Sequence, residues 1–378
     1  MKKAHNNTHK GRMKRTSRIY LKNPNKGKEE KLKHFFILIT TMVNYFIEMF
    51  WSDQTFDKEL ATKEITDRAV KKYQITARLS QALAKQAKEI VRSQHKKPKT
   101  QQTMPTFRNI SLNLDSRFWT LEKFNGSFDW ALKLTSGFPK LIIPFNNTKH
   151  SLKFINDGWV FSKSIRMGMN KKGIWIDLIF EKEKLPLKEN GNILGLDLGF
   201  RNLFATSDKE LIGTELKAQI VKSGKRRKSF HYFIDTEINR IIKTMDFSNV
   251  KTLVLEELKN VKRGNRCFKY HKSFHIHTTR KKFSRRVNRL LSFWHYARAT
   301  ERLQMICEEQ GIGLVFKDPY KTSQRCPSCG KIDRKNRNGE IFKCINCEYK
   351  EHADIVGALN LKSLQLAGVY SLRSLQSQ

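Results

Sequence analysis

Acidic residues are scarce in this sequence. Asp and Glu together number 35 against 74 Lys and Arg, which gives the 378-residue chain a formal net charge of +39. So large an excess of one sign is self-repelling in a compact chain and favours a polyanionic partner. Nucleic acid is the first candidate, because each phosphate that a Lys or Arg neutralises releases condensed counterions. A ribosomal-type binder and a membrane-surface protein are the alternatives, while 25 Phe and 39% hydrophobic residues argue against a purely disordered basic tail.

Cysteines are few, and they are unevenly placed. Four of the six form two close pairs near the C-terminus, whereas Cys267 and Cys307 stand alone. Pairs of this kind are typical of a metal site rather than of a disulfide framework. They also fit a reducing compartment, since disulfides persist mainly in oxidising ones. We therefore expect a cytoplasmic, nucleoid-associated protein.

Long hydrophobic runs are almost absent. The one candidate, from Phe35 to Trp51, is short for a membrane span of about 20 residues. It is interrupted by the polar residues Thr40, Thr41, Asn44 and Glu48. No small-residue cleavage site of the signal-peptide type follows it. We expect a buried helix here and no membrane partner.

The residue composition and the pattern of apolar residues change twice along the first half of the chain. Residues 1–15 are polar and basic, a composition typical of disorder. Helical patterns follow over 28–53 and 62–92. From 104 to 184 short alternating runs predict an antiparallel β region that forms a small barrel. A hairpin turn is expected at Asn170-Lys-Lys-Gly173 within it.

The second half contains buried strands and helices. Strands are expected at 192–198, 203–206, 250–255 and 312–317, and helices at 230–244 and 283–310.

Two of these strands carry a carboxylate, and a third carboxylate opens an apolar helix. Asp197 lies inside an apolar strand, Glu256 ends another, and Asp354 precedes the apolar run 355–361. An unpaired buried carboxylate costs on the order of several kcal/mol, so a salt bridge, backbone hydrogen bonds or a metal must compensate it. As an ordered set, the three predict a site for two Mg²⁺ ions about 4 Å apart.

Glu257 is the nearest competitor of Glu256 for this site. Adjacent strand residues point to opposite faces, so only one of the two can face the metals. We choose Glu256 because it directly follows the apolar run.

The cysteine pairs are the most specific local motif. Cys326 and Cys329 are separated by two residues, as are Cys344 and Cys347, and fourteen residues lie between the pairs. Two such turns present four thiolates to one Zn²⁺ ion and complete a tetrahedron. Because protein ligands fill all four positions, we expect one structural zinc. The alternative is a redox function for these cysteines. The presence of two pairs together argues against it.

Four motifs, taken in order, resemble a known family. They are Gly195-Leu-Asp-Leu-Gly-Phe-Arg-Asn-Leu203, Leu255-Glu-Glu-Leu258, Thr322-Ser-Gln-Arg-Cys-Pro-Ser-Cys-Gly330 and His352-Ala-Asp-Ile-Val-Gly-Ala-Leu-Asn360. Together they are similar to TnpB, the RNA-guided nuclease of small insertion-sequence transposons, and to the miniature type V CRISPR effectors. The motifs cover residues 192–362, and the first half of the chain matches in layout alone.

The resemblance implies an α+β multidomain chain with an RNase H-like, RuvC-type nuclease domain that carries Asp197, Glu256 and Asp354. The implied order is a disordered tail (1–15), a wedge-like β-barrel (16–27 and 98–185) interrupted by a helical recognition region (28–97), and the nuclease domain (191–321 and 352–378) with an inserted zinc ribbon (322–351).

The resemblance also implies a function. It is RNA-guided, Mg²⁺-dependent cleavage of DNA, with a guide RNA, a double-stranded DNA target and its displaced strand as partners. A transposon-associated monomer is favoured. The alternatives are a guide-dependent DNA binder without cleavage and an RNA-independent RuvC-like resolvase.

Basic and aromatic residues are interleaved in one further stretch. Residues 225–228 and 259–289 are dense in Lys and Arg, which predicts a groove for the RNA–DNA heteroduplex or for single-stranded DNA. A solvated charged face is the alternative. For His271, His275 and His277 we expect phosphate contacts or plain surface rather than a second metal site.

Overall fold

The chain forms two compact units in a computed structural model, an N-terminal unit (Gly11–Glu183) and a C-terminal unit that begins at Lys184. The structure describes residues 11–21, 25–52, 59–108, 111–124, 126–135, 140–199, 201–216, 218–219, 227–257, 270–272, 275–277 and 296–374.

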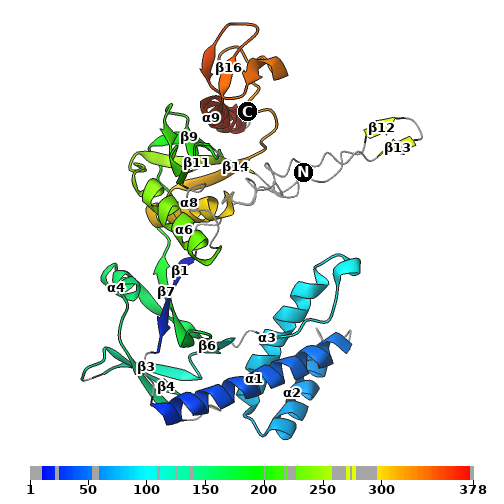
Figure 1. Ribbon diagram of the computed structural model, residues 1–378, viewed down its shortest axis with the longest axis vertical. Coiled ribbons are helices and arrows are strands. Elements are labelled where there is room, and N and C mark those ends of the chain that lie inside the picture. Colours follow the sequence, from blue (N-terminus) through cyan, green and yellow to red (C-terminus); the bar gives the residue numbers. More distant parts are fainter. Residues whose placement is uncertain are drawn as a thin grey trace. The chain divides into compact units, whose positions relative to one another are not determined.

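Two antiparallel sheets form the β part of the N-terminal unit (Figure 1). The larger has the order β1-β7-β6-β2, with β1 Arg12–Tyr20, β7 Gly173–Glu183, β6 Val160–Asn170 and β2 Ser111–Asp115. The smaller consists of β3 Trp119–Lys123, β4 Trp130–Leu134 and β5 Leu141–Phe145. The expected hairpin joins β6 to β7, and Gly173 adopts the positive φ (114°) that the turn requires.

Strand β1 corrects one prediction. Residues 12–15, expected in a disordered tail, pair with β7 instead, and Arg12 lies opposite Glu183. The physical reason is the strict alternation of the strand, in which Met13, Arg15, Ser17 and Ile19 are buried. The polar, basic character of these residues concealed that period-two pattern.

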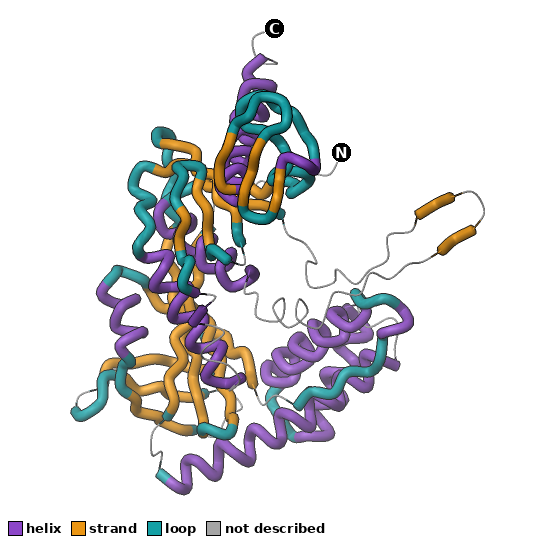
Figure 2. Tube along the Cα trace, turned by 45° about the horizontal axis from the view of Figure 1, so that its top comes forward, coloured by secondary structure: helices purple, strands orange, loops and turns teal. Residues whose placement is uncertain are grey.

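Three helices pack side by side in the same unit (Figures 1 and 2). They are α1 Lys26–Ser52, α2 Glu59–Tyr73 and α3 Ala77–His95; the short helices η1 Lys99–Gln101 and α4 Lys149–Asn156 complete the unit. By length and composition α1 could cross a membrane. Nine of its residues are nevertheless buried in the core, as expected for the apolar run.

The single helix predicted over 62–92 is wrong. The chain breaks at Gln74, whose φ is +50°, and Thr76 then caps a new helix. The Thr76 hydroxyl accepts a hydrogen bond from the Leu79 amide at 3.3 Å. A threonine at such a position stabilises a helix start, which explains why the continuous periodicity does not give one helix.

A mixed five-stranded sheet is the centre of the C-terminal unit. Its order is β10-β9-β8-β11-β14, from Leu211–Ile212, Phe204–Thr206, Asn192–Asp197, Val250–Glu256 and Gly313–Lys317. Strands β8, β11 and β14 are parallel, and β9 runs antiparallel to β8. The helices are α6 Arg227–Lys243, α8 Tyr296–Gln310 and α9 Ala353–Ser374. The helix expected over 283–310 is thus confirmed from Tyr296, and its earlier part lies outside the described residues.

Smaller elements complete this unit. The segment of residues 322–351, called the ribbon segment below, contributes η3 Arg334–Asn336, β15 Arg337–Asn338 and β16 Ile341–Lys343, and β17 Lys350–His352 follows. These three strands form one antiparallel sheet that leads directly into α9. Strands β12 Tyr270–Lys272 and β13 His275–His277 form a separate hairpin. The expected combination of helices with several sheets is confirmed, while the wedge, RuvC and zinc-ribbon assignments stay predictions.

Candidate functional site

Two of the three predicted carboxylates stand at one edge of the central sheet. Asp197 is the last residue of β8, and Glu256 is the last residue of β11. The strands are parallel neighbours, with Leu196 opposite Leu255, one residue before each carboxylate. Since parallel strands end at the same edge, this register brings the two side chains together.

The third carboxylate reaches the site because α9 approaches β8 unusually closely. A Cβ atom added at Gly195 would stand 2.1 Å from the carbonyl oxygen of Ala358, so only glycine fits at this crossing. A Cβ at Gly357 would stand 2.9 Å from Asp197 Oδ2. Asp354 lies one turn before Gly357, in the first turn of α9. The helix therefore places Asp354 beside the ends of β8 and β11.

Burial and mutual repulsion govern the charge state of this cluster. Burial raises the pKa of Asp197 well above its usual range, and the negative charges of Glu256 and Asp354 raise it further. Burial also raises the pKa of Glu256, which is 8% exposed. Carboxylates that resist ionisation side by side need positive charge between them. The cluster therefore has the electrostatic character of a cation site.

Three neighbouring side chains contact the carboxylates, and the sequence had not singled them out for this site. Thr322 donates a hydrogen bond to Glu256 Oε1 at 2.6 Å, and Asn202 donates one to Asp354 Oδ2 at 3.2 Å. Arg337 Nη2 lies 3.3 Å from Asp354 Oδ1. Asn202 and Thr322 occur within the motifs named above, whereas Arg337 lies in the loop between the cysteine pairs and has no sequence signal of its own.

The four paired cysteines converge on one point. The Sγ atoms of Cys326 and Cys347 are 3.6 Å apart, and those of Cys329 and Cys344 are 3.5 Å apart. A tetrahedral zinc site, with zinc–sulfur bonds of about 2.3 Å, requires sulfur atoms roughly 3.8 Å apart. A hydrogen bond from the Lys331 amide is the main cause that lowers the pKa of Cys329 to about 6. The cluster fits a structural metal ion, and a thiolate is favoured at one of its positions.

The carboxylates are spaced more widely than the cysteines. The four cysteine ligand atoms all lie within 4.8 Å of one another, and within the described ranges no other group of three or more His, Cys, Asp or Glu side chains is as close. Asp197, Glu256 and Asp354 therefore do not close around one point as tightly as the sulfur atoms do.

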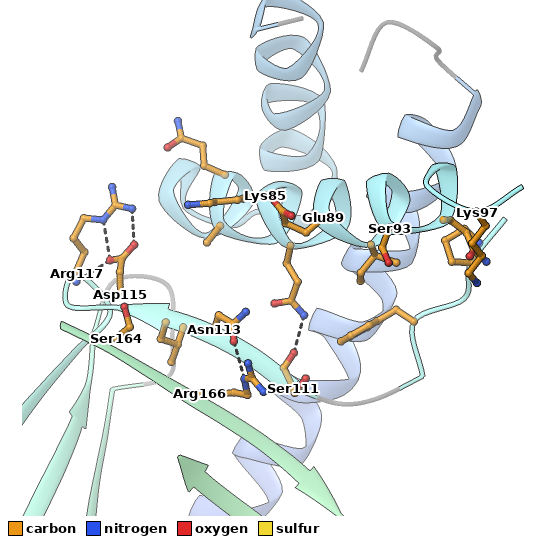
Figure 3. A pocket seen from close by; sticks show the side chains of 18 residues that line it. Lys85, Glu89, Ser93, Lys97, Ser111, Asn113, Asp115, Arg117, Ser164 and Arg166 are labelled. Carbon is orange, nitrogen blue, oxygen red and sulfur yellow. Dashed lines mark hydrogen bonds and ion pairs between the residues drawn. The ribbon is translucent and has the colours of Figure 1, made fainter. Parts of the chain in front are cut away.

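A polar groove of about 970 Å³ lies between α3 and β2 in the N-terminal unit (Figure 3). Its charged lining side chains are Lys85, Lys97, Arg117, Arg166, Glu89 and Asp115, so bases outnumber acids. The Gln86 amide nitrogen donates to the Ser111 carbonyl at 2.8 Å. The other amide atom, Oε1, is buried and has no hydrogen-bond partner within the described part of the chain. The groove is thus lined by an excess of positive charge.

The remaining sequence candidates divide into two groups. Cys307 is buried in the core of the C-terminal unit, and burial raises the pKa of its thiol to about 12, so it is a packing residue. Cys267 and the basic stretches at 225–228 and 259–289 lie almost wholly outside the described residues. The three histidines of β12 and β13 belong to the hairpin by their backbone, and their side chains are not described.

Residues 296–361 match the family model of the Cas12f1-like TNB domain. The chain is 43% identical over 75 residues to a CRISPR-associated endodeoxyribonuclease Cas12f1 of Sulfoacidibacillus thermotolerans, which is 20% of this chain and 18% of that protein. It is 34% identical over 91 residues to a TnpB-like protein of Aquifex aeolicus, which is 23% of this chain and 30% of that protein. These matches therefore span less than a third of the relatives' own length.

The fold is similar to that of a solved Cas12f1–sgRNA–target DNA complex. The TM-score is 0.58 at 15% sequence identity, and the match covers 89% of this chain and 83% of that one. At this identity the likeness concerns the fold. The predicted resemblance to TnpB and to the miniature type V CRISPR effectors is thus confirmed. Cas12f1 and TnpB-like proteins match the chain in sequence, and a Cas12f1 structure matches most of it in fold.

Proposed function

We propose that this chain, a relative of the Cas12f1 and TnpB-like proteins, is an RNA-guided endonuclease that cleaves DNA. The observation that carries the proposal is the meeting of Asp197, Glu256 and Asp354 from β8, β11 and α9. Burial and the neighbouring negative charges of Glu256 and Asp354 raise the pKa of Asp197, so ionised carboxylates at this place destabilise the protein unless cations bind there. The Cas12f1 relative is named an endodeoxyribonuclease, which supports the same chemistry.

The three carboxylates fit Mg²⁺ as ligands. They offer hard oxygen atoms, which Mg²⁺ prefers and shares with substrate phosphates. Carboxylates that come together from β8, β11 and α9 are the kind of ligand set that two such ions share. Two bound Mg²⁺ ions would supply an activated water and stabilisation of the leaving oxygen.

In the proposed reaction a water oxygen forms a bond to the phosphorus of a DNA phosphodiester. The bond from phosphorus to the 3′-oxygen breaks, so the products are a 3′-hydroxyl, which takes up a proton, and a 5′-phosphate. Arg337 contributes positive charge beside Asp354, where a negatively charged phosphate would otherwise meet three acids. Asn202 holds the Asp354 carboxylate through Oδ2.

For the four cysteines we propose one structural Zn²⁺ ion. All four sulfur atoms come from the protein, so no position remains for a substrate. The ion would hold the ribbon segment, and with it Arg337, against the carboxylates. The ribbon segment would thus be the zinc ribbon inserted into a RuvC-like domain that consists of 191–321 and 352–378.

Nucleic-acid binding follows from charge. The net charge of +39 favours polyanions, and the groove between α3 and β2 offers one place for a phosphate backbone. We propose a guide RNA, a double-stranded DNA target and its displaced strand as partners, and a cytoplasmic, nucleoid-associated monomer. The wedge-like barrel (16–27 and 98–185) and the recognition helices (28–97) would hold the RNA and the target.

The direct test is cleavage by the Asp197→Ala variant. We expect cleavage to fall by at least about a thousandfold, since the substitution removes a metal ligand, while RNA binding is unchanged. The matched control is Glu257→Gln. Glu257 is exposed and adjacent to the buried Glu256, so this variant should cut at a normal rate.

The outcomes separate the alternatives. Normal cleavage by Asp197→Ala excludes the site. Guide-dependent binding without cleavage by the wild-type protein would identify a binder, and cleavage without any bound RNA would identify a resolvase.

A further inference from the structure

Two residues far from Glu256 in the sequence donate hydrogen bonds to it, one to its backbone carbonyl and one to its side-chain carboxylate. The Tyr296 hydroxyl donates to the Glu256 carbonyl oxygen at 2.5 Å, which fixes the end of β11. The Thr322 hydroxyl donates to Glu256 Oε1 at 2.6 Å, which fixes the carboxylate. A hydroxyl has one proton to donate. The Thr322 hydroxyl has a second acceptor within reach, the Pro319 carbonyl, but this acceptor is farther away at 3.3 Å. The hydrogen bond to Glu256 is therefore the stronger of the two.

Thr322 is itself locked in place by a buried residue of α9. Asn360 donates from one amide nitrogen to the Thr322 carbonyl at 2.7 Å and to the Arg325 carbonyl at 2.8 Å. The exposed fractions of Thr322 and Asn360 are only 4% and 2%. Asn360 lies six residues after Asp354 on the same helix. The turn that carries Thr322 is therefore tied to the helix that carries Asp354.

The backbone of this turn adds rigidity. Lys321 adopts a φ of +57°, a conformation that is uncommon for a residue other than glycine. Its carbonyl oxygen accepts hydrogen bonds from the amides of Gln324 and Arg325, at 3.0 and 3.1 Å. Cys326, the first cysteine of the cluster, follows immediately. Thr322 thus lies four residues before the first cysteine of the cluster and is in contact with Glu256.

We propose that Thr322 is a positioning residue that orients Glu256 for divalent-cation binding, and that Asn360 holds Thr322 in register with Asp354. The proposal rests on the function proposed above. A free glutamate side chain samples several rotamers, and ordering it on cation binding costs entropy. The bond at Oε1 selects one orientation in advance and leaves lone pairs of Oε2 for a cation. Substitution of a residue that hydrogen-bonds to a metal ligand and orients it typically lowers metal affinity by about 10- to 100-fold.

The test compares Thr322→Val with the pair Thr322→Ser and Thr322→Ala in the full-length protein. Valine keeps the branched shape and removes the hydroxyl. Serine and alanine differ from each other in the hydroxyl alone. Mn²⁺ binding, measured by calorimetry or by electron paramagnetic resonance, reports affinity independently of cleavage. The Mg²⁺ concentration that gives half-maximal cleavage is the second measurement.

We expect Thr322→Val and Thr322→Ala to weaken Mn²⁺ binding by about 10- to 100-fold. They should raise the half-maximal Mg²⁺ concentration by a similar factor, with cleavage at saturating Mg²⁺ within a few-fold of wild type. Thr322→Ser should bind Mn²⁺ within about threefold of wild type. Zinc content and melting temperature confirm folding, and if Thr322→Val unfolds, the serine–alanine pair alone decides the matter.

Two failures remain distinguishable. If Asp197→Ala abolishes Mn²⁺ binding while Thr322→Ala binds as tightly as Thr322→Ser, the positioning role is refuted and the proposed function stands. If Asp197→Ala neither loses Mn²⁺ nor cleavage, the proposed function itself fails, and the role of Thr322 fails with it.

Discussion

At the carboxylate cluster, the side chains proposed for function are ones that lower the stability of the fold. Burial opposes the ionisation of Asp197 and Glu256, and the negative charge of Asp354 beside them opposes it further. The contacts from Thr322, Asn202 and Arg337 offset part of this cost. Sites of this kind persist because function requires them, and substitutions that relieve the conflict are expected to stabilise the fold.

Replacing Asp197 by Asn should therefore stabilise the protein in the absence of added Mg²⁺. The folded-state pKa of Asp197 is raised, so the folded protein favours the neutral, protonated side chain. The stability that this preference contributes is fully present below the ordinary pKa of about 4, and it is lost as pH rises through the raised pKa. Asparagine does not titrate. The melting temperature of Asp197→Asn, measured against wild type from pH 5 to pH 8, should show an advantage that grows with pH.

Added Mg²⁺ supplies the control for this prediction. It should raise the melting temperature of wild type near pH 8 and should have little effect on Asp197→Asn. An advantage of Asn that is absent, or equal at both ends of the pH range, would contradict the electrostatic account.

Among the elements, the crossing of α9 over β8 decides where Asp354 lies. Gly357→Ala would place a Cβ atom 2.9 Å from Asp197 Oδ2, so the carboxylate must shift. We expect divalent binding to weaken at least about tenfold with a small loss of stability, since a side-chain end can move. Gly195→Ala meets the Ala358 carbonyl at 2.1 Å and should cost more stability, because two backbones must separate.

Gly11→Ala is the matched control for both glycine variants, as no atom lies within 4 Å of its added Cβ. It should leave Mn²⁺ affinity and melting temperature unchanged. Tight Mn²⁺ binding by Gly357→Ala would show that the close contact does not set the position of Asp197.

Strand β1 is held to β7 by an ion pair between a half-exposed arginine and a buried carboxylate. Arg18 donates two hydrogen bonds to Asp177, at 2.7 and 2.8 Å, and its guanidinium lies 3.8 Å from the centroid of the Trp175 ring. Asp177 is 4% exposed. Arg18→Ala leaves that buried carboxylate without its partner and should lower the free energy of unfolding by about 2 kcal/mol, because the half-exposed guanidinium leaves a space that water can enter.

Arg12→Ala provides the comparison on the same strand. Arg12 is 59% exposed and reaches Glu181 at 3.5 Å, so its loss should cost less than about 1 kcal/mol. Denaturant unfolding of the two variants gives both values. Equal costs would mean that burial of Asp177 does not matter.

At the scale of the C-terminal unit, the cysteine cluster and the carboxylates form one connected structure. The ribbon segment supplies Arg337 to Asp354 and Thr322 to Glu256. Cys326→Ser should therefore lower zinc content from one ion per chain toward none and also weaken Mn²⁺ binding by about tenfold or more. Metal analysis and Mn²⁺ titration of the same preparation measure both effects.

Cys307→Ser is the control for zinc loss, since Cys307 is buried away from the cluster. It should retain zinc and Mn²⁺ binding, with a modest loss of stability. Unchanged Mn²⁺ affinity in a zinc-free Cys326→Ser protein would show that the two metal sites are independent.

Features that depend on local chemistry could be predicted from the sequence. An acid inside an apolar strand, as at Asp197, is conspicuous because burial makes it costly. Paired cysteines at Cys326 and Cys344 are conspicuous because two thiolates on one turn suit one ion. Both signals lie within a few neighbouring residues, so a linear reading finds them.

Which distant side chains contact these groups follows only from the three-dimensional packing of the chain. Thr322 and Asn360 lie within sequence motifs and Arg337 does not, but the motifs do not show what these side chains contact. Their roles arise where β11, the ribbon segment and α9 pack together. The break at Gln74 and the start of β1 at Arg12 were likewise settled by capping and by pairing with β7. Such contacts join residues far apart in the chain, and their energies exist only once the backbone has brought them within hydrogen-bond distance.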